Sequence, residues 1–176
     1  MEQREGEPFK RIDVHEAKQM IDAGNVQVID AREAERIAAL VAACRARGIE
    51  FTWGVSPGLD IRHCDDGDVA ALVGRLAELA RLGCRSFALL LDDIPDALDA
   101  SDLRRWGSLA AAQSHVANRV FEWQRAAHSE ARLLFCPTPY CGRMAERNYG
   151  GEGYLATVGR ELLPEIDVCW TGPEII

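Results

Sequence analysis

The sequence predicts an α/β protein built on a parallel β-sheet. Strand-like and helix-like segments alternate along most of the chain, which is the order expected when helices connect parallel strands. The strand-like segments are continuous apolar runs, such as SFALLLD at 86–92 and ARLLFC at 131–136. Such runs are typical of parallel strands buried on both sides, so we expect both faces of the sheet to be covered.

Two strands and two helices are predicted in the first half of the chain. Residues 26–30, VQVID, form a short β-branched run that favours a strand. Residues 33–48 have apolar side chains at helical spacing, basic residues near their end and Gly48 as a stop, so they predict a helix. A strand at 49–55 and, after the loop SPGLD, a helix at 68–83 follow.

The second half of the chain continues the alternation. Strand 86–92 precedes one long helix at about 101–127. Strand 131–136 leads into a glycine-rich loop, and a helix at about 153–163 and the strand IDVCWT at 166–171 follow. In parallel α/β proteins the functional residues gather at the carboxyl ends of the strands, so we expect a site there.

The composition excludes several classes of partner. The chain has 176 residues, 28 acidic against 20 basic, and its net charge of -8 argues against binding nucleic acid or an anionic membrane. No apolar stretch approaches the roughly 18 residues of a membrane helix. The charged start, MEQREGEPFKR, lacks the apolar core of a signal peptide, so we expect a cytoplasmic protein.

The cysteines favour reduced core residues over disulfides. They sit mostly inside apolar segments, without the dense spacing of a secreted disulfide scaffold. Cys136 and Cys141 are close in sequence, but no second pair and no nearby histidine completes four ligands. We therefore expect neither a zinc site nor any other cofactor.

Two pairs of adjacent aspartates have different interpretations. In HCDDGDV, at 63–69, the acids precede a helix, where Asp65, Asp66 or Asp68 would cap free N–H groups and favour the positive end of the helix dipole. We expect this acidic cluster to be structural.

Asp92 and Asp93 come directly after the apolar strand and are candidates for chemistry. Two adjacent carboxylates repel one another, which favours retention of a proton on one of them. An acid beside a persistent anion suits glycoside hydrolysis, because the leaving oxygen needs a proton while the sugar becomes cationic. The alternative is that they cap the turn before Pro95. Neighbouring positions point in different directions, so the usual acid and nucleophile arrangement does not fit.

Several phrases of the sequence together resemble glycoside hydrolase family 84, which contains the O-GlcNAcases and related bacterial β-N-acetylglucosaminidases. The resemblance covers about residues 33–176, in the family order. The phrases are FTWGVSPGLDI (51–61), LGCRSFALLLDDIP (82–95), AAQSHVANRVFEWQ (111–124), LLFCPTPYCG (133–142) and YLATVGRELLPEIDVCWTGP (154–173).

This resemblance implies a (β/α)8 TIM-type barrel and substrate-assisted retaining hydrolysis. By position, Asp92 matches the acid that orients the substrate's 2-acetamido group and stabilises the cationic intermediate. Asp93 matches the general acid/base. Tyr140 matches a tyrosine near the acetamido group and Cys136 a residue lining the pocket for its methyl, with ordinary packing as the alternative for both. Trp53 and Trp170 are expected to be core residues.

The resemblance covers part of the family's barrel. We expect residues 33–176 to form a partial glycosidase barrel domain, about the third to the sixth of eight strands. Residues 9–33 instead resemble the opening β-α-β of a rhodanese domain, with its DxR ending at Asp30 and Arg32, so residues 1–32 form a rhodanese-like segment. The sulfur-carrying cysteine loop of a rhodanese has no match. The chain is thus expected to be a gene fragment, a rearrangement or an assembly error.

The expected function is hydrolysis of terminal β-linked N-acetylglucosamine on a protein or a glycan. An unclosed barrel lacks part of the sugar contacts and exposes two sheet edges, so we expect weak or no turnover unless chains self-associate through those edges. The alternatives are a non-catalytic binding or scaffold fragment and, third, a rhodanese-like sulfurtransferase remnant.

Overall fold

The computed structural model describes residues 19, 31–146 and 153–173. The chain divides into two compact units, Met1–Arg36 and Ile37–Ile176. Most of the first unit lies outside the described residues, and so do the predicted strand at 26–30 and nearly all of the rhodanese-like segment. The described architecture is therefore that of the second unit.

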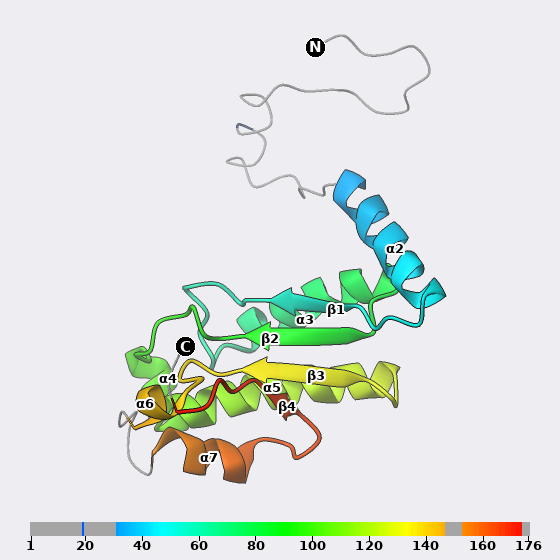
Figure 1. Cartoon of the computed structure of the whole chain (residues 1–176). Helices are drawn as coiled ribbons and strands as arrows, with labels where there is room; N and C mark the ends of the chain where they lie inside the picture. Colours follow the sequence, from blue (N-terminus) through cyan, green and yellow to red (C-terminus); the bar gives the residue numbers. More distant parts are fainter. Residues whose placement is uncertain (1–18, 20–30, 147–152, 174–176) are drawn as a thin grey trace. The chain divides into compact units, whose positions relative to one another are not determined.

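The second unit contains a sheet of parallel strands that follow one another in chain order (Figure 1). The strands are β1 (Thr52–Val55), β2 (Ser86–Leu90), β3 (Arg132–Cys136) and β4 (Asp167–Val168). Ser86 in β2 lies opposite Thr52 in β1 and Arg132 in β3, so the strands begin at the same level. Their carboxyl ends consequently meet at one edge of the sheet, and the predicted parallel sheet is confirmed.

Helices alternate with the strands. They are α2 (Ala31–Ala46), α3 (Asp66–Arg81), α4 (Ala100–Trp106), α5 (Leu109–Ala127), α6 (Gly142–Ala145) and α7 (Tyr154–Glu161). The single helix predicted at 101–127 is wrong, because Gly107 adopts a φ of 73° and ends α4. Ser108 then begins α5 by accepting a hydrogen bond from the N–H of Ala111 at 3.2 Å.

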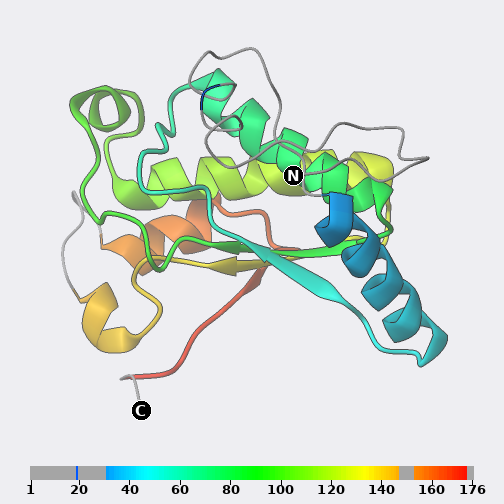
Figure 2. The ribbon, with the colours of Figure 1, turned by 90° about the horizontal axis from the view of Figure 1, so that it is seen from above.

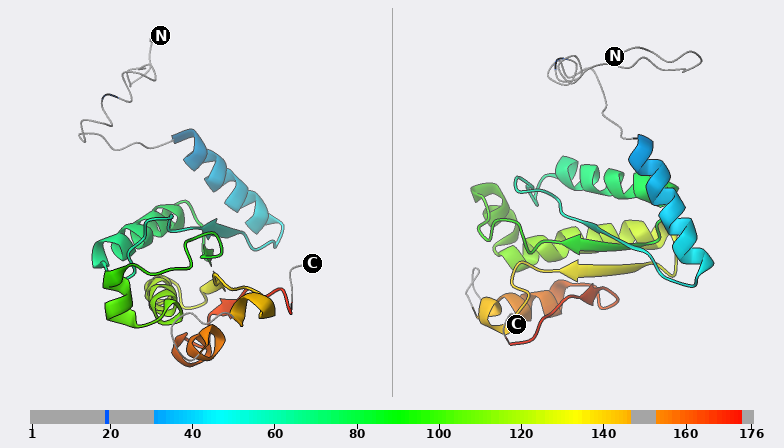
Figure 3. Two further views of the ribbon diagram at one scale, coloured as in Figure 1. Left: turned by 90° about the vertical axis from the view of Figure 1, so that its left-hand side faces the viewer. Right: turned by 45° about the horizontal axis from the view of Figure 1, so that its top comes forward.

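Helices α3, α5 and α7 lie on the same face of the sheet (Figures 2 and 3). Phe87, Leu89 and Leu133 point to this face and are at most 1% exposed. On the opposite face, Leu90 and Leu134 are only partly buried. Cover on both faces was predicted, but in the described part of the chain these three helices cover one face and the other is only partly buried. The apolar runs look continuous because the second face is also apolar, although none of these three helices packs on it.

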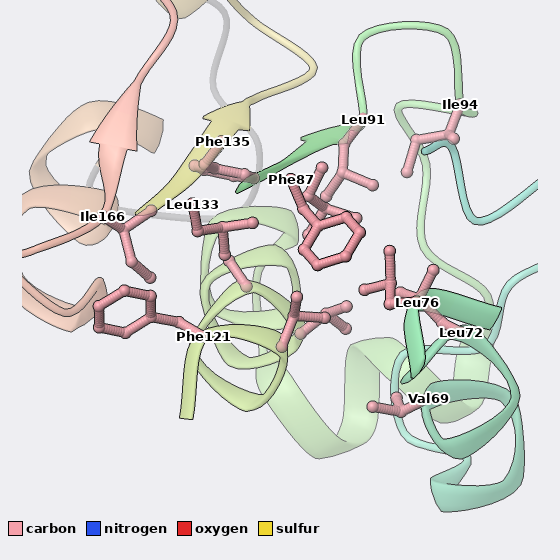
Figure 4. Packing of buried hydrophobic residues seen from close by; sticks show 14 of the residues in the cluster. Val69, Leu72, Leu76, Phe87, Leu91, Ile94, Phe121, Leu133, Phe135 and Ile166 are labelled. Atoms are coloured by element: carbon pink, nitrogen blue, oxygen red, sulfur yellow. The ribbon is translucent and has the colours of Figure 1, made fainter. Parts of the chain in front are cut away.

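The core lies between this sheet face and the helices (Figure 4). Helix α3 contributes Val69, Leu72, Leu76 and Leu79, which recur at the spacing of one helical face. Residues from α5 and β3 meet them around Phe87. The helix predicted at 68–83 is thus confirmed, and its apolar residues form the buried side.

None of the described helices combines the length and the apolar character that crossing a membrane requires.

Replacing Leu76 by alanine tests the packing of this core. The Leu76 side chain is fully buried, so its loss should lower the free energy of unfolding by about 2–5 kcal/mol. Leu40→Ala is the matched control, because Leu40 is also helical but 50% exposed, and it should cost less than about 1 kcal/mol. Urea unfolding followed by circular dichroism measures both, and equal losses would contradict the assigned core.

Candidate active site

Asp92 and Asp93 form the turn that follows β2 at the carboxyl edge of the sheet. The N–H of Leu91 donates to the carbonyl oxygen of Cys136 at 2.8 Å, so the pairing of β2 with β3 continues past the last strand residue. Leu91 is fully buried and Ile94 is 6% exposed, and both belong to the core. The two carboxylates are thus held between two buried side chains, with Asp92 half-buried and Asp93 exposed.

Asp92 lies beside Cys136, on the sheet face opposite to the helices. Burial raises the pKa of the Cys136 thiol to about 12, and the neighbouring Asp92 and Cys169 add to the effect through charge and hydrogen bonding. The thiol therefore stays protonated at neutral pH. Two of the predicted site residues, Asp92 and Cys136, are brought into contact by the fold.

Tyr140 lies half-buried in the loop that follows β3. Its carbonyl oxygen accepts hydrogen bonds from the N–H of Thr171 at 3.0 Å and from the Thr171 hydroxyl at 3.3 Å. These bonds tie the loop after β3 to the segment after β4. No described contact joins the Tyr140 ring to Asp92 or Cys136, so its place near the substrate stays a prediction.

The start of α6 approaches the same segment closely. The N–H of Gly142 donates to the carbonyl oxygen of Gly172 at 2.8 Å. The N–H of Arg143 donates to the carbonyl oxygen of Pro173 at 2.9 Å. A Cβ atom on Gly142 would lie 3.1 Å from both Cα and the carbonyl oxygen of Pro173, which is tighter than ordinary contact. Glycine is therefore the residue that fits here.

A buried polar network lies behind the turn that holds the two aspartates. The Thr138 hydroxyl donates to the carbonyl oxygen of Leu91 at 2.6 Å and accepts from Nε2 of Gln113 at 2.7 Å. The Tyr154 hydroxyl donates to Oε1 of Gln113. Residues from α5, α7 and the loop after β3 thus hold the residue that precedes Asp92. This network was not predicted from the sequence, although a glutamine inside an apolar helical run was a usable signal.

A second feature that was not predicted is the buried carboxylate of Asp102 in α4, which is 2% exposed. It accepts hydrogen bonds from the N–H groups of His63 at 2.8 Å and Cys64 at 2.6 Å, and Nδ1 of His63 lies 2.8 Å from Oδ2. Burial acts to raise the pKa of Asp102, but the hydrogen bonds from Cys64 and His63 outweigh it and hold that pKa below its usual value. The carboxylate joins the loop after β1 to the segment after Asp93.

Comparison with known proteins decides the family. A family model described as beta-N-acetylglucosaminidase matches residues 26–176, which is most of the chain. The chain belongs to this β-N-acetylglucosaminidase family. It is 39% identical over 150 residues to the Protein O-GlcNAcase of Mus musculus and to that of Rattus norvegicus. These matches cover 85% of the chain and 16% of each relative, so the chain spans about a sixth of the curated relatives' length.

Solved structures agree with this family. An O-GlcNAc hydrolase mutant of Thermobaculum terrenum superposes with a TM-score of 0.73 at 27% identity, over 84% of this chain and 31% of that one. CpGH84B superposes with a TM-score of 0.67, also at 27% identity, over 85% of this chain and 25% of that one. The resemblance to family 84 is therefore confirmed.

The rhodanese-like resemblance gains no support from these comparisons. The β-N-acetylglucosaminidase match begins at residue 26 and so includes the last part of the segment assigned to 1–32. The boundary near residue 32 stays a prediction.

The acidic cluster before α3 is structural, as predicted. Asp65 is the N-cap, and its Oδ1 accepts from the N–H of Gly67 at 2.8 Å. Asp68, in the first turn, accepts from Nε of Arg62 at 3.0 Å. Helix α4, which follows Asp92 and Asp93, is instead capped by Asp99. Neither of the two candidate catalytic aspartates is therefore used to cap this helix.

The expectation for Trp170 is wrong, whereas that for Trp53 is confirmed. Trp53 is partly buried and packs against the core. Trp170 is 40% exposed. It follows β4, which is the last strand of the described sheet and has two residues, so no further strand of that sheet covers this side of it.

Replacing Thr138 by valine tests the polar network. Valine fills the same space but leaves the carbonyl of Leu91 and Nε2 of Gln113 without this partner, so the free energy of unfolding should fall by about 2 kcal/mol. Thr171→Val is the control, because the bond that its hydroxyl donates to Tyr140 is long, at 3.3 Å, and exposed, so losing it should cost less than about 0.5 kcal/mol. Chemical unfolding measures both changes. Equally small losses of unfolding free energy in Thr138→Val and Thr171→Val would contradict a stabilising role for the network.

Asp102→Asn tests the buried carboxylate. Because the folded-state pKa is lowered, this group stabilises the fold above its unfolded-state pKa of about 4 and loses the effect as pH falls through the folded value. At pH 7 the variant should be less stable by about 3 kcal/mol, since asparagine cannot accept all the bonds. The difference between wild type and variant, from urea unfolding, should shrink between about pH 5 and 2. A difference independent of pH would contradict the assignment.

Proposed function

We propose that this chain carries the catalytic pair of a β-N-acetylglucosaminidase that hydrolyses terminal β-linked N-acetylglucosamine. The observation that carries the proposal is the placement of Asp92 and Asp93 at the carboxyl end of β2, in a chain of this family. Asp92 faces the side of the sheet where Cys136 lies, while Asp93 is exposed beside it. The two carboxylates therefore have different surroundings and can take different roles.

In the proposed mechanism the substrate supplies the nucleophile. The oxygen of its 2-acetamido group attacks the anomeric carbon and forms an oxazoline-like intermediate, while Asp92 orients the acetamido N–H and stabilises the developing positive charge. Asp93 donates a proton to the leaving oxygen and then, as a carboxylate, removes one from the attacking water. The exposure of Asp93 suits both steps, because the leaving group and water must reach it.

Tyr140 and Cys136 are proposed to bind the acetamido group. The half-buried Cys136 thiol beside Asp92 offers a small apolar surface for the acetamido methyl. The loop after β3 brings Tyr140 to the same edge of the sheet. The proposed partner is an N-acetylglucosamine-bearing protein or glycan, and the cytoplasmic location stays a prediction.

The described sheet is proposed to be about the third to the sixth strand of a (β/α)8 barrel. Its parallel strands in chain order and the packing of α3, α5 and α7 on one face support this proposal. The chain spans 31% of the Thermobaculum terrenum protein, and a sheet of this size forms only part of such a barrel. We therefore expect slow turnover by the chain alone, with self-association through β1 and β4 as a route to a fuller site.

The experiment compares Asp92→Asn and Asp93→Asn on aryl N-acetyl-β-glucosaminides with good and poor leaving groups. Loss of a general acid should slow the poor leaving group by about 100-fold or more and the good one much less. Loss of the group that assists the acetamido attack should slow both substrates. Steady-state hydrolysis rates of the purified chain provide the measurement.

Asp66→Asn is the control, since Asp66 is exposed in the first turn of α3 and should leave the rates unchanged. Rates that are equal in wild type, Asp92→Asn and Asp93→Asn would contradict the assigned pair.

A non-catalytic binding role is the second candidate, favoured by the half-exposed apolar sheet face around Leu90 and Leu134. Calorimetry with N-acetylglucosamine separates the two functions. A catalytic centre should bind the sugar in a way that Asp92→Asn weakens, whereas a scaffold should show no sugar binding that depends on Asp92.

A further inference from the structure

Cys136 and Cys169 lie next to each other on adjacent strands. Cys136 is the last residue of β3, and Cys169 follows β4 directly. The register pairs Phe135 with Val168, and the N–H of Cys169 donates to the carbonyl oxygen of Phe135 at 2.8 Å. The next pair in this ladder is Cys136 with Cys169. Adjacent strands lie about 5 Å apart, which is within the Cα separation that disulfides span.

The two thiols share the sheet face that α3, α5 and α7 leave uncovered. Phe135 is fully buried on the helical side, so alternation along the strand directs Cys136 to the other side. The thiols of Cys136 and Cys169 are in hydrogen-bonding contact. Both residues are partly exposed, whereas Cys84 and Cys141 are buried. A small thiol reagent can therefore reach this pair from solvent.

We propose that Cys136 and Cys169 form a dithiol site that reacts with a low-molecular-weight disulfide and closes into a reversible cross-strand disulfide. Cys136 is also the residue proposed above to line the acetamido pocket, but the disulfide is a property of the two cysteines, and no catalytic turnover is needed to detect it. Its ligand class is a small organic disulfide, of which oxidised glutathione is the probe.

The order of the two reaction steps follows from the surroundings of the thiols. Burial and the Asp92 carboxylate keep Cys136 protonated, so Cys169 attacks first, as its thiol gives up its proton to solvent. It bonds to one sulfur of oxidised glutathione and releases one glutathione thiolate, which takes up a proton. The Cys136 thiol then loses its proton to solvent, and its sulfur attacks the Cys169 sulfur and displaces the second glutathione. In total, two protein thiols are oxidised and one glutathione disulfide is reduced to two glutathione molecules.

After the first step the Cys169 sulfur carries a glutathionyl group and still lies beside the Cys136 sulfur. The proximity of the two sulfurs then makes ring closure faster than attack by a second external thiol.

The test treats the full chain with oxidised glutathione under native conditions, quenches with acid, and maps non-reduced peptides by mass spectrometry. The expected product is a Cys136–Cys169 link without retained glutathione, which dithiothreitol reverses. Cys136→Ser should instead retain one glutathionyl group on Cys169, and Cys169→Ser should leave Cys136 mostly unmodified. Cys44→Ser, a partly exposed helical cysteine distant in sequence from the pair, should form the link as the wild type does.

Wild-type chain that keeps both thiols free, or keeps glutathione on Cys169, would overturn the proposal. A second comparison uses only the wild-type chain, so it does not depend on whether the variants fold. It measures the same reaction under native conditions and in concentrated urea. The link should form at least about 10-fold faster under native conditions if the strand pairing brings the thiols together. An equal rate in urea would also overturn the proposal.

Discussion

The hydrogen bond from the N–H of Leu91 to the carbonyl oxygen of Cys136 continues the β2–β3 ladder beyond the strand, and the geometry of the site depends on it. Because Leu91 is buried among core residues, the alternation of side chains sends Asp92 to the opposite face of the sheet. The chain then turns, and Ile94 returns to the core. Asp92 and Asp93 thereby differ in exposure, as the different roles proposed for them require.

Helix α5 is hydrogen-bonded to the sheet near both the carboxyl and the amino ends of the strands, through two buried glutamines. Gln113 reaches the carboxyl end through Thr138, whereas Nε2 of Gln124 donates at 2.9 Å to the carbonyl oxygens of both Arg85 and Arg132 near the amino ends. Buried amides that are left without partners are costly, so these bonds favour one position of the helix along the strands over shifted ones. Apolar packing, which is less directional, brings the helix to the sheet but does not set this position as sharply.

Much of the fold could be predicted because its signals are local. The apolar runs of β2 and β3 and the periodicity of α3 are visible in short windows of sequence. Gly107 was missed as a break because a single glycine inside a helical pattern is often tolerated. Asp92 and Asp93 stood out as charges after an apolar run. The contact between His63 and Asp102 joins residues 39 positions apart, and no periodic pattern marks such a pair.

The segment from Asp92 to Asp102 is held at both of its ends. At the start of the segment, the carbonyl oxygen of Leu91 accepts a hydrogen bond from the Thr138 hydroxyl. At its end, the Asp102 carboxylate accepts hydrogen bonds from two backbone N–H groups. A chain segment fixed in this way has already lost much of its conformational entropy on folding. If this turn binds a sugar as proposed, binding needs little further ordering of the segment, because folding itself has already fixed it.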